Sequence, residues 1–170
     1  MSGTIEMTTQ ATEKRSRGSV RGLLGDERHL RWTIQILVIG LYGYGLLAHV
    51  DGDWDRARRH YAVAVDGFID LGTPVWEGIA LAGLGRCDEA DGDTAAAIAR
   101  YAEALELGRR LGEPAVTACA LEGLARLALA AGDRATATTR SVEAAGIREQ
   151  FQRPAPPHEL DDLRPLVEAS

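Results

Sequence analysis

The sequence has little cysteine, little aromatic content and almost no lysine. Its two cysteines, Cys87 and Cys119, stand in no CxxC or Cys/His spacing, so neither a structural zinc site nor any other metal is expected. Aromatic residues make up only 5% of the chain, while alanine and leucine are abundant, which favours helices over strands. Eighteen of the nineteen basic residues are arginine, which we interpret as codon bias in a GC-rich bacterial genome.

Several sequence motifs that are typical of catalytic or cofactor sites are also missing. The chain has no phosphate-binding loop, nucleophile elbow, zinc helix or dinucleotide fingerprint, so no cofactor is expected. Residues 1–20 are polar and lack the apolar core of a signal peptide, and we therefore expect a cytoplasmic protein. Catalysis is not excluded, because a small helical protein can use a shaped apolar pocket with one or two polar groups.

Positive charge is scarce over most of the chain. The net charge is −6, and it is unevenly distributed: residues 1–60 carry nine basic and seven acidic side chains, residues 61–170 ten basic and eighteen acidic. Residues 61–170 therefore have a net charge of −8. An acidic body repels phosphate backbones, so nucleic acid is not an expected partner.

One long stretch carries no charge at all. The seventeen residues Trp32–Ala48 contain Gln35 and three glycines, and they fall short of the roughly 20 apolar residues that a membrane span needs. We interpret this stretch as a helix covered by protein rather than by a membrane.

What the sequence does contain is a repeat with a period of 40 residues. The dipeptide Gly-Asp recurs at 52–53, 92–93 and 132–133, and the flanking residues recur with it. The matched flanking positions are Leu41, Leu81 and Leu121; Ala57, Ala97 and Ala137; Tyr61, Tyr101 and Ser141; Ala64, Ala104 and Ala144. A fixed period of this length predicts a stacked repeat protein.

Each repeat is predicted to be a helical hairpin. The first helices are expected over about Arg28–Val50, Pro74–Ala90 and Pro114–Ala131, and the second helices over Asp53–Gly72, Asp93–Gly112 and Asp133–Gln152. The aspartate after each glycine is a good N-cap, proline suits the first turn of a helix, and glycine suits its end.

The repeat also sets the expected domain organisation. Residues 1–19 are interpreted as a flexible tail, residues 20–152 as three hairpins, and residues 153–170 as a proline-rich linker with a capping helix. That last helix is expected over about His158–Ala169, disturbed by Pro165.

The pattern of leucine, glycine, Gly-Asp, alanine and tyrosine, clearest over Leu81–Leu105, resembles the tetratricopeptide repeat over about residues 28–152. The resemblance implies an all-α, right-handed solenoid of helical hairpins. The 40-residue period with Leu-Gly at the end of each hairpin is similar to the repeat modules of large bacterial regulators of the MalT and LuxR-ATPase type. Their ATPase and DNA-binding motifs are missing, so a transcription-factor function does not carry over.

In tetratricopeptide arrays the first helices line a concave groove. The resemblance places these residues there: Ile39, Tyr42, Leu46, His49, Val50, Ile79, Ala82, Arg86, Glu89, Ala90, Cys119, Glu122, Arg126, Leu129 and Ala130. The binding candidates among them are Tyr42, His49, Arg86, Glu89, Glu122 and Arg126. The first hypothesis for function is a non-catalytic interaction module that binds a peptide or protein partner in this groove.

The alternative hypothesis is a small-molecule-binding protein or an accessory biosynthetic enzyme of the cyclase or isomerase type. Its apolar pocket would carry Arg86, Asp88 and Glu89, and the weak catalytic candidates are Asp88, Glu89 and His49. Asp88 stands out because the matching repeat positions are alanine. It can also be a solvated helix end, paired with Arg86 or Arg126.

The first helix of the first repeat is apolar on every side, although no earlier repeat covers it. A helix that is apolar all round has to be covered all round. The cover can be residues 1–27, a ligand or a second copy of the chain, and we expect a homodimer with a seam at Ile34, Leu37, Val38 and Leu41.

Overall fold

The computed structural model describes residues 27–151 and 163–169. It divides into two compact units, Met1–Leu37 and Val38–Ser170, and the hairpin architecture belongs to the second. The expected tail over residues 1–19 and the linker residues 153–162 lie outside the described residues.

The described residues form seven helices and contain no strand, so the all-α prediction is confirmed. The helices are α2 (Glu27–Val50), α3 (Trp54–Leu71), α4 (Pro74–Ala90), α5 (Thr94–Leu111), α6 (Pro114–Ala130), α7 (Arg134–Gln150) and α9 (Arg164–Glu168). The predicted hairpin helices agree with these bounds to within two residues. The expected last helix is seen as α9, with Pro165 in its first turn rather than as an interruption.

The Gly-Asp turns act as predicted. The side chains of Asp53, Asp93 and Asp133 accept hydrogen bonds from the backbone N–H three residues later, at 3.1, 3.0 and 3.0 Å. Gly52, Gly92 and Gly132 have positive φ angles between 74° and 81°, a conformation that costs glycine little. The same local chemistry therefore closes all three hairpins.

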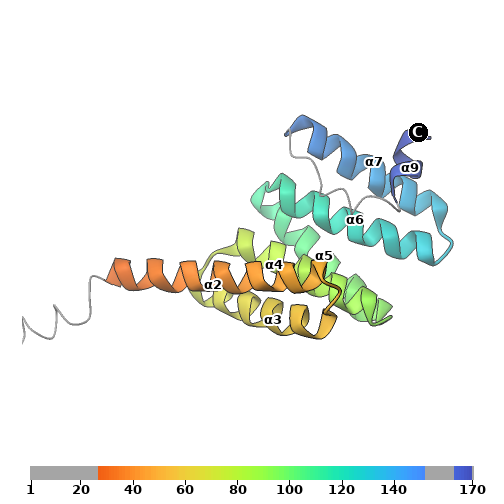
Figure 1. The fold of residues 1–170 in the computed structure, drawn as a ribbon. Helices are drawn as coiled ribbons and strands as arrows, with labels where there is room; N and C mark the ends of the chain where they lie inside the picture. Colours follow the sequence, from red (N-terminus) through yellow and green to blue (C-terminus); the bar gives the residue numbers. More distant parts are fainter. Residues whose placement is uncertain (1–26, 152–162, 170) are drawn as a thin grey trace, which may run out of the picture. The chain divides into compact units, whose positions relative to one another are not determined.

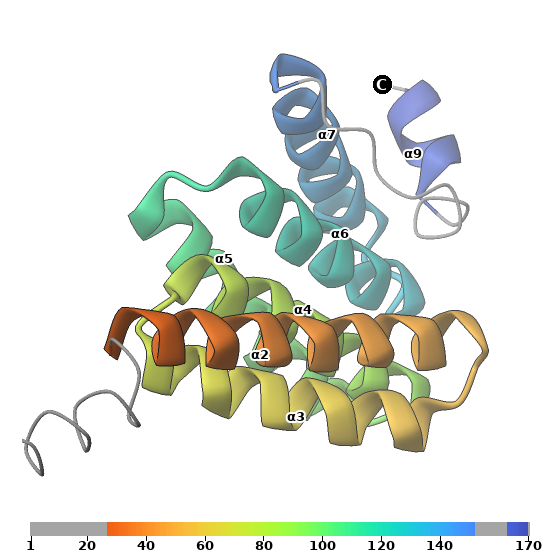
Figure 2. The same cartoon turned by 60° about the vertical axis from the view of Figure 1, so that its left-hand side comes forward.

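The hairpins stack in sequence order into a tetratricopeptide-like helical solenoid (Figures 1 and 2). Within the second unit, α4 contacts α3 and α5, and α6 contacts α5, α7 and α4. The short helix α9 packs on α7, where Leu163 and Leu166 cover Ala125 and Ala137. The first helices of successive hairpins thus share one side of the stack, and this arrangement positions the candidate site.

Tyrosine rings inserted between glycines hold successive hairpins together. A Cβ atom added to Gly45 or Gly83 would lie 2.8 or 2.9 Å from the ring of Tyr61. At Gly85 and Gly123 it would lie 2.8 and 2.3 Å from the ring of Tyr101. Both rings are 1% exposed, so the repeated tyrosine fills the space that the repeated glycines leave. At Gly43 nothing lies within 4 Å of an added Cβ atom, so this glycine has no such ring against it among the described residues.

Candidate functional site

A shallow hollow of about 50 Å³ lies across the first helices of the three hairpins. Its lining comes from α2, α4 and α6, with two tyrosines contributed by the second helices. The lining residues are Tyr42, Leu46, His49, Tyr61, Ile79, Ala82, Gly83, Arg86, Tyr101, Cys119 and Arg126. The structure therefore brings together four of the six binding candidates, Tyr42, His49, Arg86 and Arg126.

A fifth candidate, Glu89, stands at the polar end of the hollow as the centre of a hydrogen-bonded cluster. Arg126 donates from Nε to Glu89 Oε1 at 3.1 Å and from Nη2 to Oε2 at 3.2 Å. The Tyr101 hydroxyl donates to Glu89 Oε2 at 2.9 Å and accepts from Arg126 Nη2 at 3.2 Å. Burial raises the pKa of Tyr101, so the phenol stays protonated as a donor. The cluster joins α4 and α6, the first helices of the second and third hairpins, to Tyr101 of α5.

Arg86 is held less firmly than Arg126. Its Nη1 lies 3.6 Å from Glu89 Oε2, and its buried Nε has no hydrogen-bond partner among the described residues. A buried donor without a partner costs about 1–3 kcal/mol. A ligand oxygen, from a carbonyl or a carboxylate, would remove that cost. Arg86 is thus the side chain of the hollow best placed to gain from an occupant.

The other end of the hollow is aromatic. Tyr42 packs against Tyr61 and Trp76 with ring centroids 5.6 and 6.2 Å apart. His49 is buried against Trp54, at 4.8 Å, and its Nδ1 lies 3.4 Å from the Tyr61 hydroxyl. The lining thus changes from aromatic side chains at α2 to charged side chains at α4 and α6.

Asp88 faces away from the hollow, toward the second helices. Its carboxylate pairs with Arg58 of α3 and lies 3.9 Å from Arg100 Nε of α5. Arg58 also donates to Asp91 at 2.6 Å, and its hydrogen bond to Asp88 raises the pKa of the guanidinium. The observed partner is therefore Arg58, not Arg86 or Arg126, and Asp88 ties three helices together instead of joining Arg86 and Glu89.

Comparison with known families adds to this geometry. Residues 37–110 match the family model of the tetratricopeptide repeat. The match supports the presence of tetratricopeptide repeats in this segment. No curated protein and no solved structure matches the chain. Tetratricopeptide repeats generally mediate protein–protein interactions and bind protein or peptide partners.

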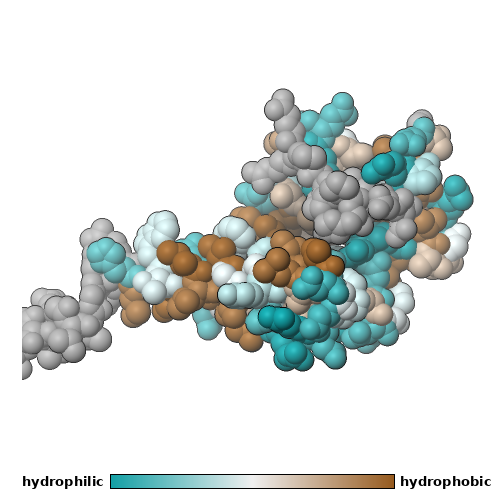
Figure 3. Space-filling model, viewed as in Figure 1, coloured by the Kyte–Doolittle hydropathy of each residue, from teal (hydrophilic) through white to brown (hydrophobic). Residues whose placement is uncertain are grey.

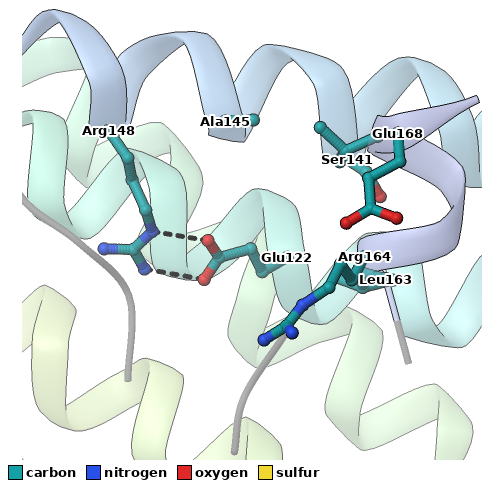
Figure 4. A pocket seen from close by; sticks show the side chains of 8 residues that line it. Glu122, Ser141, Ala145, Arg148, Leu163, Arg164 and Glu168 are labelled. Atoms are coloured by element: carbon teal, nitrogen blue, oxygen red, sulfur yellow. Dashed lines mark hydrogen bonds and ion pairs between the residues drawn. The ribbon is translucent and has the colours of Figure 1, made fainter. Parts of the chain in front are cut away.

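The sixth candidate, Glu122, does not line this hollow and lies at a second cavity beside α7 and α9 (Figure 4). Arg148 donates to it from Nε at 2.5 Å and from Nη2 at 2.7 Å, and Nη2 lies 3.5 Å from Cys119 Sγ. Both partners are largely buried. Burial lowers the pKa of Arg148, but its interactions with Glu122 and Cys119 together outweigh burial and raise it. The sequence did not reveal Arg148, because its partner is 26 residues away.

The residues of the expected dimer seam differ in their exposure. Val38 packs in the core of the first hairpin, 2.8 Å from where a Cβ on Gly67 would lie, and Leu41 is half-buried. Ile34 and Leu37 lie earlier on α2 and are exposed. Apolar surface continues along this helix (Figure 3), and His29–Val50 is long and apolar enough to cross a membrane by length and composition alone. Mostly buried core helices of soluble proteins and signal sequences near an N-terminus pass the same test, and 22% of the window is buried here.

Metal binding has no candidate in the part of the chain that the structure describes. No three or more histidine, cysteine or carboxylate side chains gather there in a way that could hold an ion. Cys87 is buried and Cys119 half-buried, and neither is in a disulfide. Burial raises the pKa of the Cys87 thiol to about 11, so it is a poor nucleophile at neutral pH.

Proposed function

We propose that this chain is a non-catalytic interaction module that binds a peptide segment of a protein partner in the hollow on α2, α4 and α6. The observation that carries the proposal is the shape and make-up of the hollow. It is shallow, it spans all three hairpins, and it combines apolar rings with Arg86, whose buried Nε has no hydrogen-bond partner in the described part of the chain. Tetratricopeptide repeats generally bind such partners, which supports the same function.

The size of the hollow disfavours the small-molecule alternative at this place. Pockets that enclose a small ligand usually have about 300–1,000 Å³, whereas this hollow has about 50 Å³. The residues expected to act together in that alternative are also separated. Asp88 pairs with Arg58 on the other side of α4 and does not join Arg86 and Glu89. An accessory enzyme using Arg86, Asp88 and Glu89 together is therefore the weaker proposal.

The chemistry of the hollow indicates what the partner segment presents. Glu89 already offsets the charge of Arg126, so the polar end keeps the positive charge of Arg86. The aromatic end offers Tyr42 and Ile79 to an apolar side chain. We therefore expect a segment with an apolar anchor and, a few residues away, a carboxylate or an exposed carbonyl oxygen.

A displayed library of random peptides, selected on the immobilised chain, tests this proposal. The variant Leu46→Arg places a long charged side chain in the hollow, and Leu111→Arg makes the same change on α5 outside it. Both leucines are 38% exposed, so they are a matched pair. Selected peptides should lose about ten-fold or more in affinity for Leu46→Arg, a change of about 1.4 kcal/mol, and keep their affinity for Leu111→Arg.

Two results would count against the peptide proposal. One is that selected peptides bind both variants equally, which would move the binding surface elsewhere. The other is that the chain retains a defined molecule from a metabolite extract, that Leu46→Arg abolishes the retention, and that no peptide is selected. That outcome would restore the small-molecule alternative at the hollow.

We also propose that two copies pair through α2. The exposed face of this helix includes Gly40, Tyr44 and Leu47, with Tyr44 55% and Leu47 61% exposed. One period later the matching positions on α4 are Ala80, Leu84 and Cys87, and all three are buried. The face of α2 is thus the one that a preceding hairpin would cover, and a second copy can cover it in a closed twofold pair.

Light scattering of the full chain at micromolar concentration tests the pairing. The chain should have twice its monomer mass, and Leu47→Glu should give a monomer. Ile69→Glu is the control on α3, because Ile69 is also more than half exposed. A monomeric unmodified chain would refute the dimer. Val38→Glu is unsuitable as a test, because Val38 packs in the core.

The remaining aspects of the proposal rest on the sequence. The net charge of −8 over residues 61–170 supports a partner other than nucleic acid. The 40-residue period supports kinship with the repeat modules of MalT-type bacterial regulators, and the arginine-rich composition supports a bacterial source. We propose a cytoplasmic location on the polar character of residues 1–20.

A further inference from the structure

The second cavity, between α6, α7 and α9, has a volume of about 370 Å³ and is lined mainly by apolar atoms (Figure 4). It does not belong to the hollow described above. The third hairpin departs from the repeat at this cavity. The position that is tyrosine in the first two hairpins, Tyr61 and Tyr101, is Ser141 in the third, and Ser141 lines the cavity.

The first two hairpins show what usually fills this space. The Tyr101 ring lies against Gly85 and Gly123, leaving no room for a Cβ on either glycine. In the third hairpin Gly85 is matched by Ala125, and Ser141 offers only a hydroxyl, which donates to Ala137 O at 2.8 Å. A small side chain thus stands where an aromatic ring would stand, and the ring is not replaced by another from the described residues.

The ends of the cavity are polar but electrically balanced. Glu122 and Arg148 form the bidentate pair described above, with side chains 3% and 11% exposed. Arg164 and Glu168 of α9 add one charge of each sign at the lining (Figure 4). The four formal charges sum to zero, so a charged ligand would remain uncompensated in a largely apolar space.

We propose that this cavity binds a small, neutral, largely apolar aromatic molecule. Its volume lies within the range of about 300–1,000 Å³ that encloses small ligands. Burying the apolar surface of an aromatic molecule against such a lining is favourable, and the charged side chains at the ends are already paired or balanced. The occupant takes the place of the tyrosine ring that the third hairpin lacks, and Leu163, Val167 and Ala145 contact its apolar surface.

Two fluorescent probes that share one skeleton test the proposal on the full chain. N-phenyl-1-naphthylamine is neutral, and 8-anilinonaphthalene-1-sulfonate adds a sulfonate to the same rings. The neutral probe should bind with enhanced emission and raise the melting temperature, and the anionic probe should bind about ten-fold or more weakly. Equal binding of the two probes would contradict the charge argument.

Variants on α7 locate the binding. Ala145→Trp fills the cavity, and Val142→Trp makes a similar change at an exposed position of the same helix outside it. The neutral probe should lose about ten-fold or more in affinity for Ala145→Trp and stay within about two-fold for Val142→Trp. The helical circular dichroism of each variant shows whether it folds. If Ala145→Trp does not fold, Val167→Trp fills the cavity from α9 and takes its place.

Two outcomes overturn the proposal. The first is that the unmodified chain does not bind the neutral probe. The second is that folded Ala145→Trp and Val167→Trp bind it as well as Val142→Trp does, which would assign the probe to another apolar surface, such as α2.

Discussion

Gly123→Ala is the substitution that most sharply tests how the hairpins are held together. Gly123 lies in the middle of α6, where alanine is ordinarily the better residue. A Cβ atom there would lie 2.3, 2.4 and 2.6 Å from three atoms of the Tyr101 ring. The ring cannot move aside easily, because it packs against Gly85 on its other side and its hydroxyl is bonded to Glu89 and Arg126.

The expected change in the free energy of unfolding is the difference between two opposing effects. Replacing glycine by alanine inside a helix gains about 1 kcal/mol of helix propensity. Forcing a methyl group into a packed core costs about 1–3 kcal/mol, and the overlap here of about 1 Å places the cost at the upper end. The net loss should be about 2 kcal/mol. For a chain of this size that lowers the melting temperature by about 4–8 °C.

Gly146→Ala supplies the matched control for this prediction. Gly146 lies within α7, and nothing is within 4 Å of its added Cβ, so only the propensity gain remains. Thermal and urea unfolding followed by circular dichroism should show Gly146→Ala stabilised by about 1 kcal/mol and Gly123→Ala destabilised. In a Tyr101→Ser background Gly123→Ala should cost less stability than in the unmodified chain, because the clash disappears. A Gly123→Ala chain as stable as Gly146→Ala would refute the packing of Tyr101.

Three further perturbations follow from the structure. Glu122→Ala leaves the buried Arg148 guanidinium without its carboxylate and should cost about 3–5 kcal/mol in urea unfolding, whereas Arg109→Ala, which breaks an exposed pair with Glu143, should cost about 1 kcal/mol or less. Burial raises the pKa of Cys87 from 9.0 to about 11, so the folded chain binds the thiol proton more tightly than the unfolded chain. The free energy of unfolding should therefore fall as pH rises between those values, by at most about 1.4 kcal/mol per pH unit, and Cys87→Ala should show a smaller slope. Asp93→Ala removes the N-cap of α5 and should lower the free energy of unfolding by about 1 kcal/mol, which differential scanning calorimetry can measure.

The sequence was a good guide wherever the determining interactions repeat or are local. The Gly-Asp frame predicted the hairpins because its turn and N-cap involve residues within four positions of each other. The same frame placed Tyr42, Arg86 and Arg126 on one surface, because equivalent positions of stacked hairpins face the same way.

The sequence was a poor guide wherever one hairpin departs from the others. The partner of Asp88 is Arg58, thirty residues earlier, and neither residue recurs at its matching position in the next repeat. Glu122 was assigned to the groove by its register, but Arg148 draws it to the other cavity. The cavity depends on residue 141 being serine where the other two hairpins have tyrosine. Its volume also depends on α9, a helix that the 40-residue period does not predict.

The claim that the chain binds a partner through the hollow on α2, α4 and α6 can be tested most directly by nuclear magnetic resonance. The ¹⁵N-labelled chain would be titrated with a peptide from the displayed library, and the amide shifts followed residue by residue. The largest changes should fall at Tyr42, Ile79, Arg86 and Arg126, with little change at Ala102 on the exposed side of α5. Changes concentrated on α5 or α3, with the hollow unaffected, would contradict it.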